Sequence, residues 1–371
     1  MLILTINSGS SSVRLGLMEK KHSGDIRCHA HVHFNTPAER PAVLLDAFLD
    51  NQHQAGIAAV VHRVVHGGDR LRASTVITPD IESGIDTASV MAPLHNPVAL
   101  TWIAAARDLF GKDIPQIAAF DTAFYTDMPD TASTYALPQR LRTAHHVRRY
   151  GFHGLAHRGM WERWHDISGM ASTGSVISIQ LGSGCSITAI DRGKAIDTSM
   201  GFSPLEGLMM STRCGDIDPG LLIYLQRYAG FDLDQIEHML SHESGLAGIS
   251  GSSGDMRVLL EEGSAEAELA IEMFCYRAIK YIGAYWTILG GADALLFGGG
   301  IGAHSPPIRQ RITQGLSVLG LELDSRANAQ GEADSCISST DSSTGIWVIA
   351  DQEQRIMAEE AVSLLAQGAI S

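Results

Sequence analysis

Residues 180–215 read QLGSGCSITAIDRGKAIDTSMGFSPLEGLMMSTRCG. A β-branched run at 176–179 leads into the small-residue stretch 181–184, and a second alternating run follows at 186–190. This pattern predicts a strand, a tight turn and a returning strand. Backbone N–H groups exposed in such a glycine and serine turn can hold a phosphate. Arg213 is suited to bidentate binding of a carboxylate or phosphoryl group. The plainer interpretation of the stretch is a hairpin with an exposed arginine.

The same pattern occurs at the start of the chain. Residues 3–7 and Gly9 align with residues 176–180 and Gly182, and each set is followed by a second alternating run. The repeat predicts an internal duplication on a scale larger than a solenoid repeat. We therefore expect an α/β fold in two related halves, with ligands at the carboxyl ends of the strands, in the cleft between the halves.

Composition narrows the class of protein. At 371 residues the chain is long for one domain, so two domains are expected. The net charge of −14 argues against a nucleic-acid partner or an anionic membrane surface. The five cysteines are scattered without CxxC spacing, which favours a reducing cytoplasm over a disulfide scaffold or a zinc site. We expect no signal peptide, because Met1 leads directly into a predicted strand. We expect no membrane span, because no apolar run approaches roughly 20 residues.

Several local signals give specific expectations. Asn96 followed by proline predicts a helix with Asn96 as its N-cap. The apolar run 117–120 predicts a buried strand that ends at Asp121. Residues 298–302 (GGGIG) predict a glycine-rich loop for nucleotide, although glycine turns alone are a weak signal. Residues 325–345 are expected to form a surface loop, and Asp351 is expected to cap the last helix.

Polar residues follow the predicted strands at several places. Each has a plain structural explanation: Asp121 could be a helix N-cap, and Arg63 an edge cation in a salt bridge. His153 and His157 have the spacing of a zinc pair but lack the accompanying ligands, so we expect a hydrogen-bonding role for His153 and a structural one for His157. Together, the sets are typical of phosphoryl transfer, which needs positioning and charge neutralisation. They are Asn7 with Ser10 and Ser12, residues 62–68, Asp121, His153 with His157, and residues 180–215 with Arg213. Residues 298–302 are expected to hold the adenosine or the phosphates of a nucleotide.

These motifs resemble the signatures of the acetate kinase family almost from end to end. The matching segments are INSGSSS (6–12), HRVVHGG (62–68), APLHNP (92–97), FDTAF (120–124), RYGFHG (149–154) and IDTSMGFSPLEGLMM (196–210). The resemblance implies two duplicated ribonuclease-H-like domains of the actin-like ATPase fold. The expected domains are residues 1–124 with 354–371, and residues 125–353, of which the second binds nucleotide.

The resemblance also implies Mg²⁺-dependent (or Mn²⁺-dependent), reversible transfer of a phosphoryl group from ATP to acetate, giving ADP and acetyl phosphate in a cytoplasmic homodimer. The implied catalytic residues are Asp121, His153 and Arg213, and the metal site is Asn7 and Glu353. Arg63 is implied to bind the carboxylate, beside an apolar pocket of Val65, Leu94, Phe152 and Pro204. The implied nucleotide contacts are Arg14, Gln180, Gly182, Ser183, Gly184, Asp255, Met256, Arg257, Gly299, Gly300, Ile301, Gly302 and Ala303.

Physical chemistry shapes two of these roles. Acetate is an anion at neutral pH and needs no general base, so we expect Asp121 to orient an arginine or the metal shell rather than take a proton. Val65 favours acetate, but one methylene is worth only about 1–3 kcal/mol, so propionate is expected to be a poorer substrate rather than an excluded one.

The chain departs from the family pattern on the phosphate-donor side. The family commonly has Lys at Arg14, His at Gln180 and Asn at Ser183, Glu-Asn-Ser at 303–305, and Asn-Glu-Glu at 352–354. The alternatives are therefore a kinase for propionate or another short-chain acid, one using GTP or pyrophosphate, and a non-catalytic nucleotide-binding relative. Asp255 and Arg257 favour a nucleotide donor.

Overall fold

A computed structural model describes the chain except for residues 10–11, 22, 36–39, 51–55, 170–173 and 369–371. It contains two compact units, and each is described by itself. The first comprises residues 1–126, 152–159 and 352–371, and the second comprises residues 127–151 and 160–351. The domain boundaries expected from the sequence stay a prediction. Ser10 lies outside the described residues.

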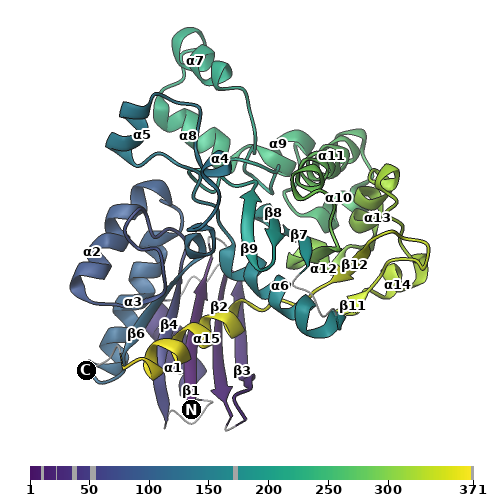
Figure 1. Cartoon of the computed structure of the whole chain (residues 1–371). Coiled ribbons are helices and arrows are strands. Elements are labelled where there is room, and N and C mark those ends of the chain that lie inside the picture. Colours follow the sequence, from purple (N-terminus) through teal and green to yellow (C-terminus); the bar gives the residue numbers. More distant parts are fainter. Residues whose placement is uncertain (10–11, 22, 36–39, 51–55, 170–173, 369–371) are drawn as a thin grey trace. The chain divides into compact units, whose positions relative to one another are not determined.

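The first unit is built on a six-stranded mixed sheet of order β3-β2-β1-β4-β6-β5 (Figure 1). The expected N-terminal hairpin is confirmed: β1 pairs antiparallel with β2 from Leu2↔Glu19 to Ser8↔Val13. Strands β1, β4 and β6 are parallel neighbours, so their carboxyl ends meet at one edge of the sheet. The strands are β1 (Leu2–Ser8), β2 (Ser12–Lys20), β3 (Ile26–Asn35), β4 (Ile57–Val64), β5 (Thr75–Val76) and β6 (Gln116–Phe120).

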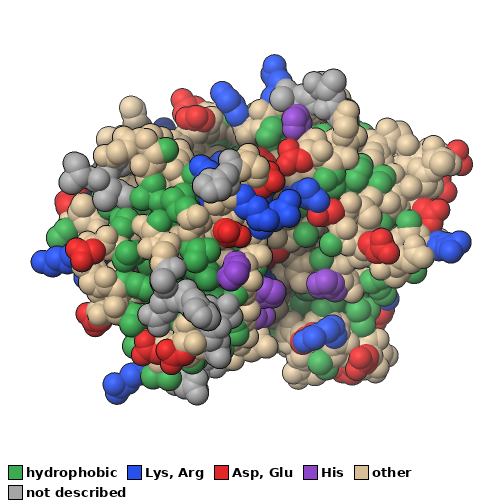
Figure 2. Space-filling model, turned by 90° about the horizontal axis from the view of Figure 1, so that it is seen from below, with side chains coloured by type: hydrophobic (Ala, Val, Ile, Leu, Met, Phe, Trp, Pro, Cys, Tyr) green, Lys and Arg blue, Asp and Glu red, His purple; other side chains and the backbone are tan. Residues whose placement is uncertain are grey.

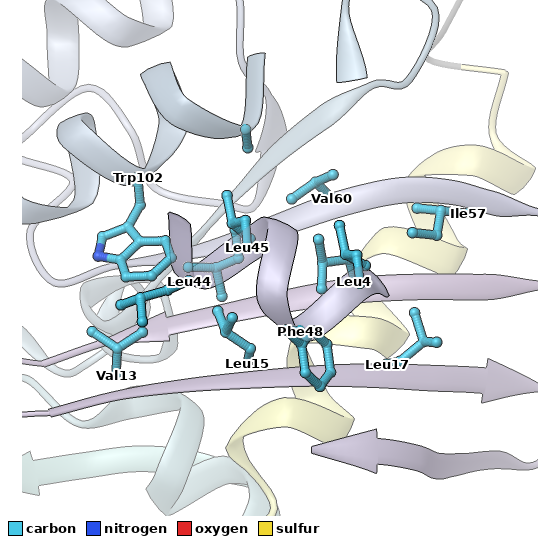
Figure 3. Packing of buried hydrophobic residues seen from close by; sticks show 13 residues of the cluster. Leu4, Val13, Leu15, Leu17, Leu44, Leu45, Phe48, Ile57, Val60 and Trp102 are labelled. Carbon is cyan, nitrogen blue, oxygen red and sulfur yellow. The ribbon is translucent and has the colours of Figure 1, made fainter. Parts of the chain in front are cut away.

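Helices cover both faces of this sheet. On one face, α1 (Pro41–Asp50) and α3 (Asn96–Phe110) pack Leu45, Phe48 and Trp102 against Leu4 and Leu15 (Figure 3). On the other face, α15 (Glu353–Ala366) packs its apolar residues on β1, β4 and β6. Burial of each such leucine or phenylalanine stabilises the folded state by about 1.5–3 kcal/mol. The packed sheet therefore supports the side chains at its edge. The other helices are α2 (Pro79–Ala88), η1 (Ser89–Met91), η2 (Asp121–Tyr125) and the start of α6 (Gly154–Ser168).

The second unit repeats the architecture of the first. Its sheet has the order β11-β12-β10-β7-β8-β9, with β7–β10 and β10–β12 parallel and the other pairs antiparallel. Strands β1, β2, β3, β4, β6 and β5 therefore correspond in order to β7, β8, β9, β10, β12 and β11, and the predicted duplication is confirmed. The strands are β7 (Ser175–Leu181), β8 (Cys185–Asp191), β9 (Lys194–Thr198), β10 (Ala294–Gly298), β11 (Ser335–Cys336) and β12 (Gly345–Val348).

The long helix α11 (Ala265–Leu289) packs on β7 and β8. Ser264 caps its start by accepting a hydrogen bond from the Ala267 backbone N–H, and Gly290 ends it in the left-handed conformation. The other helices are α4 (Asp130–Ser133), α5 (Gln139–His145), α7 (Pro219–Tyr228), α8 (Leu233–His242), α9 (Gly245–Ser250), α10 (Met256–Glu262), α12 (Gly299–His304), α13 (Pro306–Gln314), η3 (Ser317–Leu319) and α14 (Ser325–Gln330).

Four local expectations were wrong. Asn96 is the first residue of α3 rather than its cap, because its buried amide bonds the backbone of His66 and Ile85 instead. Residues 299–302 belong to the short helix α12 rather than a loop. The stretch 325–345 contains α14, capped by Asp324, and β11. Asp351 does not cap the last helix, whose N-cap position is Gln352.

The described helices include none that is both long and apolar enough to cross a bilayer. On the face shown in Figure 2, Asp and Glu side chains lie at many separate places, with Lys and Arg side chains among them.

Candidate active site

The first of two candidate regions lies in the first unit, at the sheet edge where β1, β4 and β6 end. Asn7 is near the end of β1, Arg63 is near the end of β4, and Asp121 follows β6 directly. Parallel strands place their carboxyl ends together, and ligands of α/β folds bind at such an edge. The buried strands thus bring together three polar side chains that are far apart in the sequence.

Arg63 and Asp121 form a buried bidentate ion pair. Arg63 Nη2 donates to Asp121 Oδ2 at 2.7 Å, and Nε lies 3.1 Å from Oδ1 and 3.2 Å from Oδ2. The Asp121 side chain has no exposure, and that of Arg63 is 11% exposed. Asp121 is therefore not a helix N-cap, and Arg63 is not an edge cation. The fork geometry holds the guanidinium in one orientation, as anion recognition requires.

Asn7 and Glu353 extend this pair into a network. Arg63 Nη1 donates to Asn7 Oδ1 at 3.2 Å, and Asn7 Nδ2 donates to Glu353 Oε2 at 2.8 Å. Glu353 Oε1 lies 3.9 Å from Arg63 Nη1. Arg14, on β2 directly opposite Asn7, places Nη1 3.8 Å from Glu353 Oε2 and is 41% exposed. Asn7, expected at the metal, and Arg14, expected at the nucleotide, thus both lie beside the carboxylate of Glu353.

Burial and charge oppose each other in this network. Burial raises the pKa of Asp121 above its ordinary value, while hydrogen bonds from Arg63 and from the His153 backbone oppose the rise. Burial alone would lower the pKa of Arg63, but the carboxylates of Asp121 and Glu353 hold it above its ordinary value. Arg63 is therefore a permanent cation in a water-poor position, where its attraction for an anion is strong.

The RYGFHG segment packs directly on Asp121. The backbone of His153 has φ of +56°, a conformation that non-glycine residues rarely adopt, and its N–H bonds Asp121. A Cβ on Gly154 would lie 1.9 Å from the Asp121 carbonyl oxygen, so only glycine fits there. His157 is fully buried, and burial lowers its pKa to about 3, so it is a neutral structural residue.

Among the described residues, no group of three or more His, Cys, Asp or Glu has the clustering of a metal site.

Two buried side chains that the sequence did not reveal hold the loop after β4. Asn96 Oδ1 accepts from the His66 backbone N–H at 3.1 Å, and Asn96 Nδ2 donates to the His66 carbonyl at 2.9 Å. Thr122 Oγ1 accepts from the Gly67 N–H at 3.1 Å. The APLHNP and FDTAF segments were recognised by resemblance, but no local pattern shows that they pair with this loop.

The same loop contains part of the expected apolar pocket. Val65 and Phe152 are buried, and Leu94 is partly buried in the turn before α3. The Phe152 ring makes an edge contact with the ring of His66, next to Val65, at 5.3 Å between centroids. The structure thus connects Phe152 to the loop of Val65.

The second candidate region lies at the ends of β7 and β10 in the second unit. The turn at residues 182–184 joins β7 to β8, as expected, with the Gly182 N–H bonded to the Gly184 carbonyl at 3.1 Å. Gly299 has φ of +75°, and a Cβ there would lie 2.4 Å from the Leu181 carbonyl oxygen. Glycine is therefore required where α12 begins, which brings residues 182–184 and 299–303 together. The Gln180 side chain lies beside Gly298.

Residues 255–257 form a separate local feature of this unit. Asp255 caps α10 by accepting from the Arg257 N–H, and its Oδ2 accepts from Arg257 Nη2 at 2.6 Å. Hydrogen bonds from Arg257 lower the pKa of Asp255. Met256 is buried, whereas the Arg257 side chain is 87% exposed. The hydrogen bonds between the Asp255 carboxylate and Arg257 thus stay within this pair.

Arg213 and Pro204, expected in two different roles, are in direct contact. Arg213 Nη1 donates to the Pro204 carbonyl at 2.6 Å. Both lie in the stretch 199–218, which contains neither helix nor strand. The orientation of the Arg213 guanidinium thus depends on how this stretch is held.

Arg309 is a further residue that the sequence did not reveal. It is completely buried, and its Nη1 donates to the carbonyls of Gly302 and Ala303 at 2.8 Å each. Its Nε and Nη2 bond Asn328 at 2.8 Å. Burial lowers its pKa to about 10, so it stays a cation at neutral pH. Arg309 therefore anchors the carbonyl end of α12, and no local pattern distinguishes it from a surface arginine.

Two copies of one mixed sheet, a buried arginine–carboxylate network in one copy and glycine-rich strand ends in the other define a class of enzyme. The fold is the two-domain α/β fold of the actin-like ATPases, and the chain is a phosphotransferase with a carboxyl group as acceptor.

Comparison with known proteins gives the family. The model of the acetokinase family matches residues 30–359, and the chain belongs to that family. A protein named acetate kinase from Solibacter usitatus is 41% identical, with 98% of each chain covered. The crystal structure of a propionate kinase from Francisella tularensis is similar with a TM-score of 0.87, 36% identity and coverage of 97% of this chain and 98% of the other. The crystal structure of Porphyromonas gingivalis acetate kinase is similar with a TM-score of 0.85 and 34% identity, and the match covers 98% of this chain and 99% of the other.

Proposed function

We propose that this protein is an acetate kinase, which transfers the γ-phosphoryl group of ATP to acetate and catalyses the reverse reaction. One oxygen of the acetate carboxylate attacks the γ-phosphorus, the bond from that phosphorus to the β,γ-bridging oxygen breaks, and ADP leaves. The products are acetyl phosphate and ADP, and no proton is transferred. Family membership and the four functional side chains in the first unit support this proposal.

The observation that supports it most directly is the buried Arg63–Asp121 pair. Two anions must meet for this reaction, and a positioned cation offsets their repulsion. Arg63 is the residue suited to bind the acetate carboxylate. Because both Asp121 oxygens are occupied by Arg63, Asp121 is proposed to orient that guanidinium rather than to act as a base.

His153 and Arg213 are proposed to donate hydrogen bonds to the equatorial oxygens of the phosphoryl group in transfer. Donors placed where charge develops in the transition state are worth roughly 3 kcal/mol each. His153 has a backbone φ of +56°, which few non-glycine residues adopt, and Arg213 donates a hydrogen bond to the Pro204 carbonyl. Both observations support preorganisation of these donors.

The glycine-rich strand ends of the second unit are proposed to bind the nucleotide. The residues are Gln180, Gly182, Ser183, Gly184 and 299–303, with residues 255–257 and Arg14 as further contacts. A Cβ on Gly299 would lie 2.4 Å from the Leu181 carbonyl oxygen, whereas a Cβ on Gly300 would have no atom within 4 Å. The open space beside the Gly300 backbone supports close approach of a phosphate chain. Since residues 14, 180, 183 and 303–304 differ from the common family pattern, other donors belong in the test.

The residues present are compatible with Mg²⁺, which Asn7 and Glu353 would hold. Magnesium prefers six oxygen ligands and is usually bound through one or two carboxylates, with phosphate oxygens and water completing the shell. Glu353 offers one carboxylate beside the Asn7 amide, which fits this mode rather than an all-protein cage. When bound, the ion would neutralise phosphate charge.

Glu353→Gln is expected to raise the Mg²⁺ concentration needed for half-maximal activity by about tenfold, because a neutral amide binds the ion less tightly than a carboxylate. The measurement is a Mg²⁺ titration of initial rate at fixed ATP. Glu360→Gln, about two helical turns further along α15, is the control, since its carboxylate pairs with Arg158. An unchanged Mg²⁺ requirement in Glu353→Gln would remove this residue from the metal site.

A propionate kinase is the second candidate, because one of the similar solved structures carries that name. Val65→Ala tests the acyl pocket: removing two methyl groups is expected to raise kcat/KM for propionate relative to acetate by about 10-fold to 100-fold. The measurement is kcat/KM for both acids in both proteins. If the ratio does not change, Val65 does not line the acyl pocket.

The direct test of the proposed function is a hydroxamate assay for acyl phosphate, scanned over ATP, GTP and pyrophosphate with acetate and propionate. Acetate with ATP and Mg²⁺ is expected to give the highest kcat/KM. A higher value with propionate would favour the second candidate, and turnover with pyrophosphate alone would reassign the donor. No turnover with any pair would indicate a non-catalytic nucleotide-binding relative. A cytoplasmic homodimer stays a prediction, which light scattering after gel filtration checks for the dimer.

A further inference from the structure

We propose that Tyr135, Arg149 and Glu206 form a clamp that positions Arg213 for phosphoryl transfer, an inference that rests on the proposed function. These three are positioning residues and do not touch the substrate. All of them lie in the second unit with Arg213. The stretch that they hold, residues 199–218, has neither helix nor strand, so its shape depends on side-chain bonds.

Glu206 is the centre of the clamp. Its Oε1 accepts a hydrogen bond from Arg149 Nη2 at 2.6 Å, and its Oε2 accepts one from the Tyr135 hydroxyl. The guanidinium of Arg149 also lies over the Tyr135 ring, 5.5 Å from its centroid. Burial, together with Glu206, raises the pKa of Tyr135, so the phenol keeps its proton and remains a donor.

The clamp also bonds the backbone that precedes Glu206. Arg149 Nη1 donates to the carbonyls of Thr198 and Ser199 at 3.2 Å each, where β9 ends. The Tyr135 oxygen accepts from the Phe202 N–H at 2.9 Å. One charged side chain and one phenol thus tie the start of the stretch to the segment 133–151.

The absence of a side chain at Gly201 leaves the space that the clamp occupies. A Cβ on residue 201 would lie 1.6 Å from Glu206 Oε2 and 2.1 Å from the Tyr135 hydroxyl oxygen. The Gly201 carbonyl accepts from the N–H groups of Tyr150 and Gly151, which precede Phe152 and His153 in the RYGFHG segment. Any larger residue at this position would displace the carboxylate.

The link from the clamp to Arg213 is short. Pro204 lies two residues before Glu206, and its carbonyl accepts the bond from Arg213 Nη1 at 2.6 Å. A second anchor follows: Asp216 accepts from the Gly207 N–H at 2.9 Å and from the Tyr281 hydroxyl at 2.7 Å. Pro204 lies between the backbone bonds of the clamp at residues 198–202 and Glu206, and Arg213 lies between Glu206 and Asp216. Loss of the Glu206 anchor would therefore release the guanidinium while leaving the stretch attached at Asp216.

The test uses Glu206→Gln and Tyr135→Phe in the full chain. The amide that Glu206→Gln introduces can satisfy only one of the two donors, so both variants are expected to lower kcat about tenfold or more with less than a threefold change in the KM for acetate. Glu268→Gln is the matched control. Its carboxylate pairs with Arg311, in the same unit but with no bond to residues 199–218, and its kcat is expected to stay within twofold of wild type.

A double-variant comparison separates positioning from general stability. In an Arg213→Ala background, Glu206→Gln is expected to cause almost no further loss of kcat, because the residue through which it acts is gone. A merely structural residue would instead lower kcat by the same factor in both backgrounds. That result, or a wild-type kcat in both Glu206→Gln and Tyr135→Phe, would overturn the proposal.

A second measurement does not depend on activity, so it separates this proposal from the proposed function. In protein labelled with ¹⁵N-arginine, the Arg213 Nε–H signal, assigned by its loss in Arg213→Lys, is expected to be sharp and slow to exchange in the wild type. In Glu206→Gln it is expected to broaden or exchange at least tenfold faster. An identical signal in both proteins would contradict the clamp. If the wild type formed no acyl phosphate while this signal changed as expected, the proposed function would fail and the clamp would remain.

Discussion

Arg213→Ala is expected to lower kcat at least a hundredfold while the thermal unfolding midpoint changes by less than about 2 °C. The loss follows from removing a positioned cation where charge develops on the transferring phosphoryl group. Stability is expected to change little because Arg213 is only partly buried and bonds a backbone carbonyl, which water can satisfy after the substitution. The measurements are steady-state kinetics for acetyl phosphate formation and a calorimetric scan.

Arg213→Lys refines this result. Lysine keeps the charge but lacks the fork that can bond the Pro204 carbonyl and a phosphoryl oxygen together, so it is expected to recover only a small part of the activity. Arg192→Ala is the control, since that arginine is exposed and pairs with its neighbour Asp191. A kcat near the wild-type value in Arg213→Ala would remove Arg213 from the mechanism.

Asp121→Asn is expected to affect both activity and stability. Asparagine is nearly the same size, but it leaves Arg63 as a buried cation without its main counter-charge. Breaking a buried ion pair from one side costs about 3–5 kcal/mol of unfolding free energy. The freed guanidinium would also lose its fixed orientation toward the acetate carboxylate, so kcat/KM is expected to fall at least a hundredfold.

Urea unfolding and steady-state kinetics of the same preparation check this expectation. The exposed pair of Arg70 with Asp80, whose side chains are 69% and 72% exposed, supplies the control. Asp80→Asn is expected to change the unfolding free energy by less than about 1 kcal/mol. If Asp121→Asn were as stable as Asp80→Asn, the Arg63–Asp121 pair would not have the energetic role assigned to it.

The parts of the fold that the sequence predicted are those with a local signal. The hairpins at the start of each half alternate with period two, and their small-residue turns mark where the chain reverses, so their strands and register were predictable. Asp121 was correctly placed at the end of its strand because a short apolar run must be buried and its polar successor must emerge at the sheet edge.

The errors and omissions share a physical cause. Asn96 is a residue type that often caps a helix, but its side-chain amide hydrogen-bonds the backbone of His66 instead. The two residues are far apart in the sequence, so no local pattern predicts this contact. The glycines at 299–302 form a helix because the strand before them directs the chain against Leu181. Arg309 and Glu206 were missed for the same reason: their partners lie across the fold, and only the folded chain shows that their charges are used inside the protein.

The duplicated sheets also explain why the two candidate regions differ in their chemistry. Both copies present the carboxyl ends of three parallel strands, β1, β4 and β6 in one and β7, β10 and β12 in the other. In the first copy these ends hold Asn7, Arg63 and Asp121, which suit an anionic acceptor and a metal. In the second copy the ends of β7 and β10 hold glycines, which suit backbone contact with phosphates. The same platform thus provides two kinds of anion recognition.

Direct transfer of the γ-phosphoryl group from ATP to a carboxylate oxygen of acetate is tested by a ³¹P NMR time course of the wild-type protein. The sample contains ATP, Mg²⁺ and acetate labelled with ¹⁸O in its carboxylate. ADP and acetyl phosphate are expected to appear at equal rates, with one ¹⁸O in the P–O–C bridge shifting the acetyl phosphate resonance. ATP cleaved only to ADP and inorganic phosphate, or acetyl phosphate without the isotope in its bridge, would contradict direct transfer.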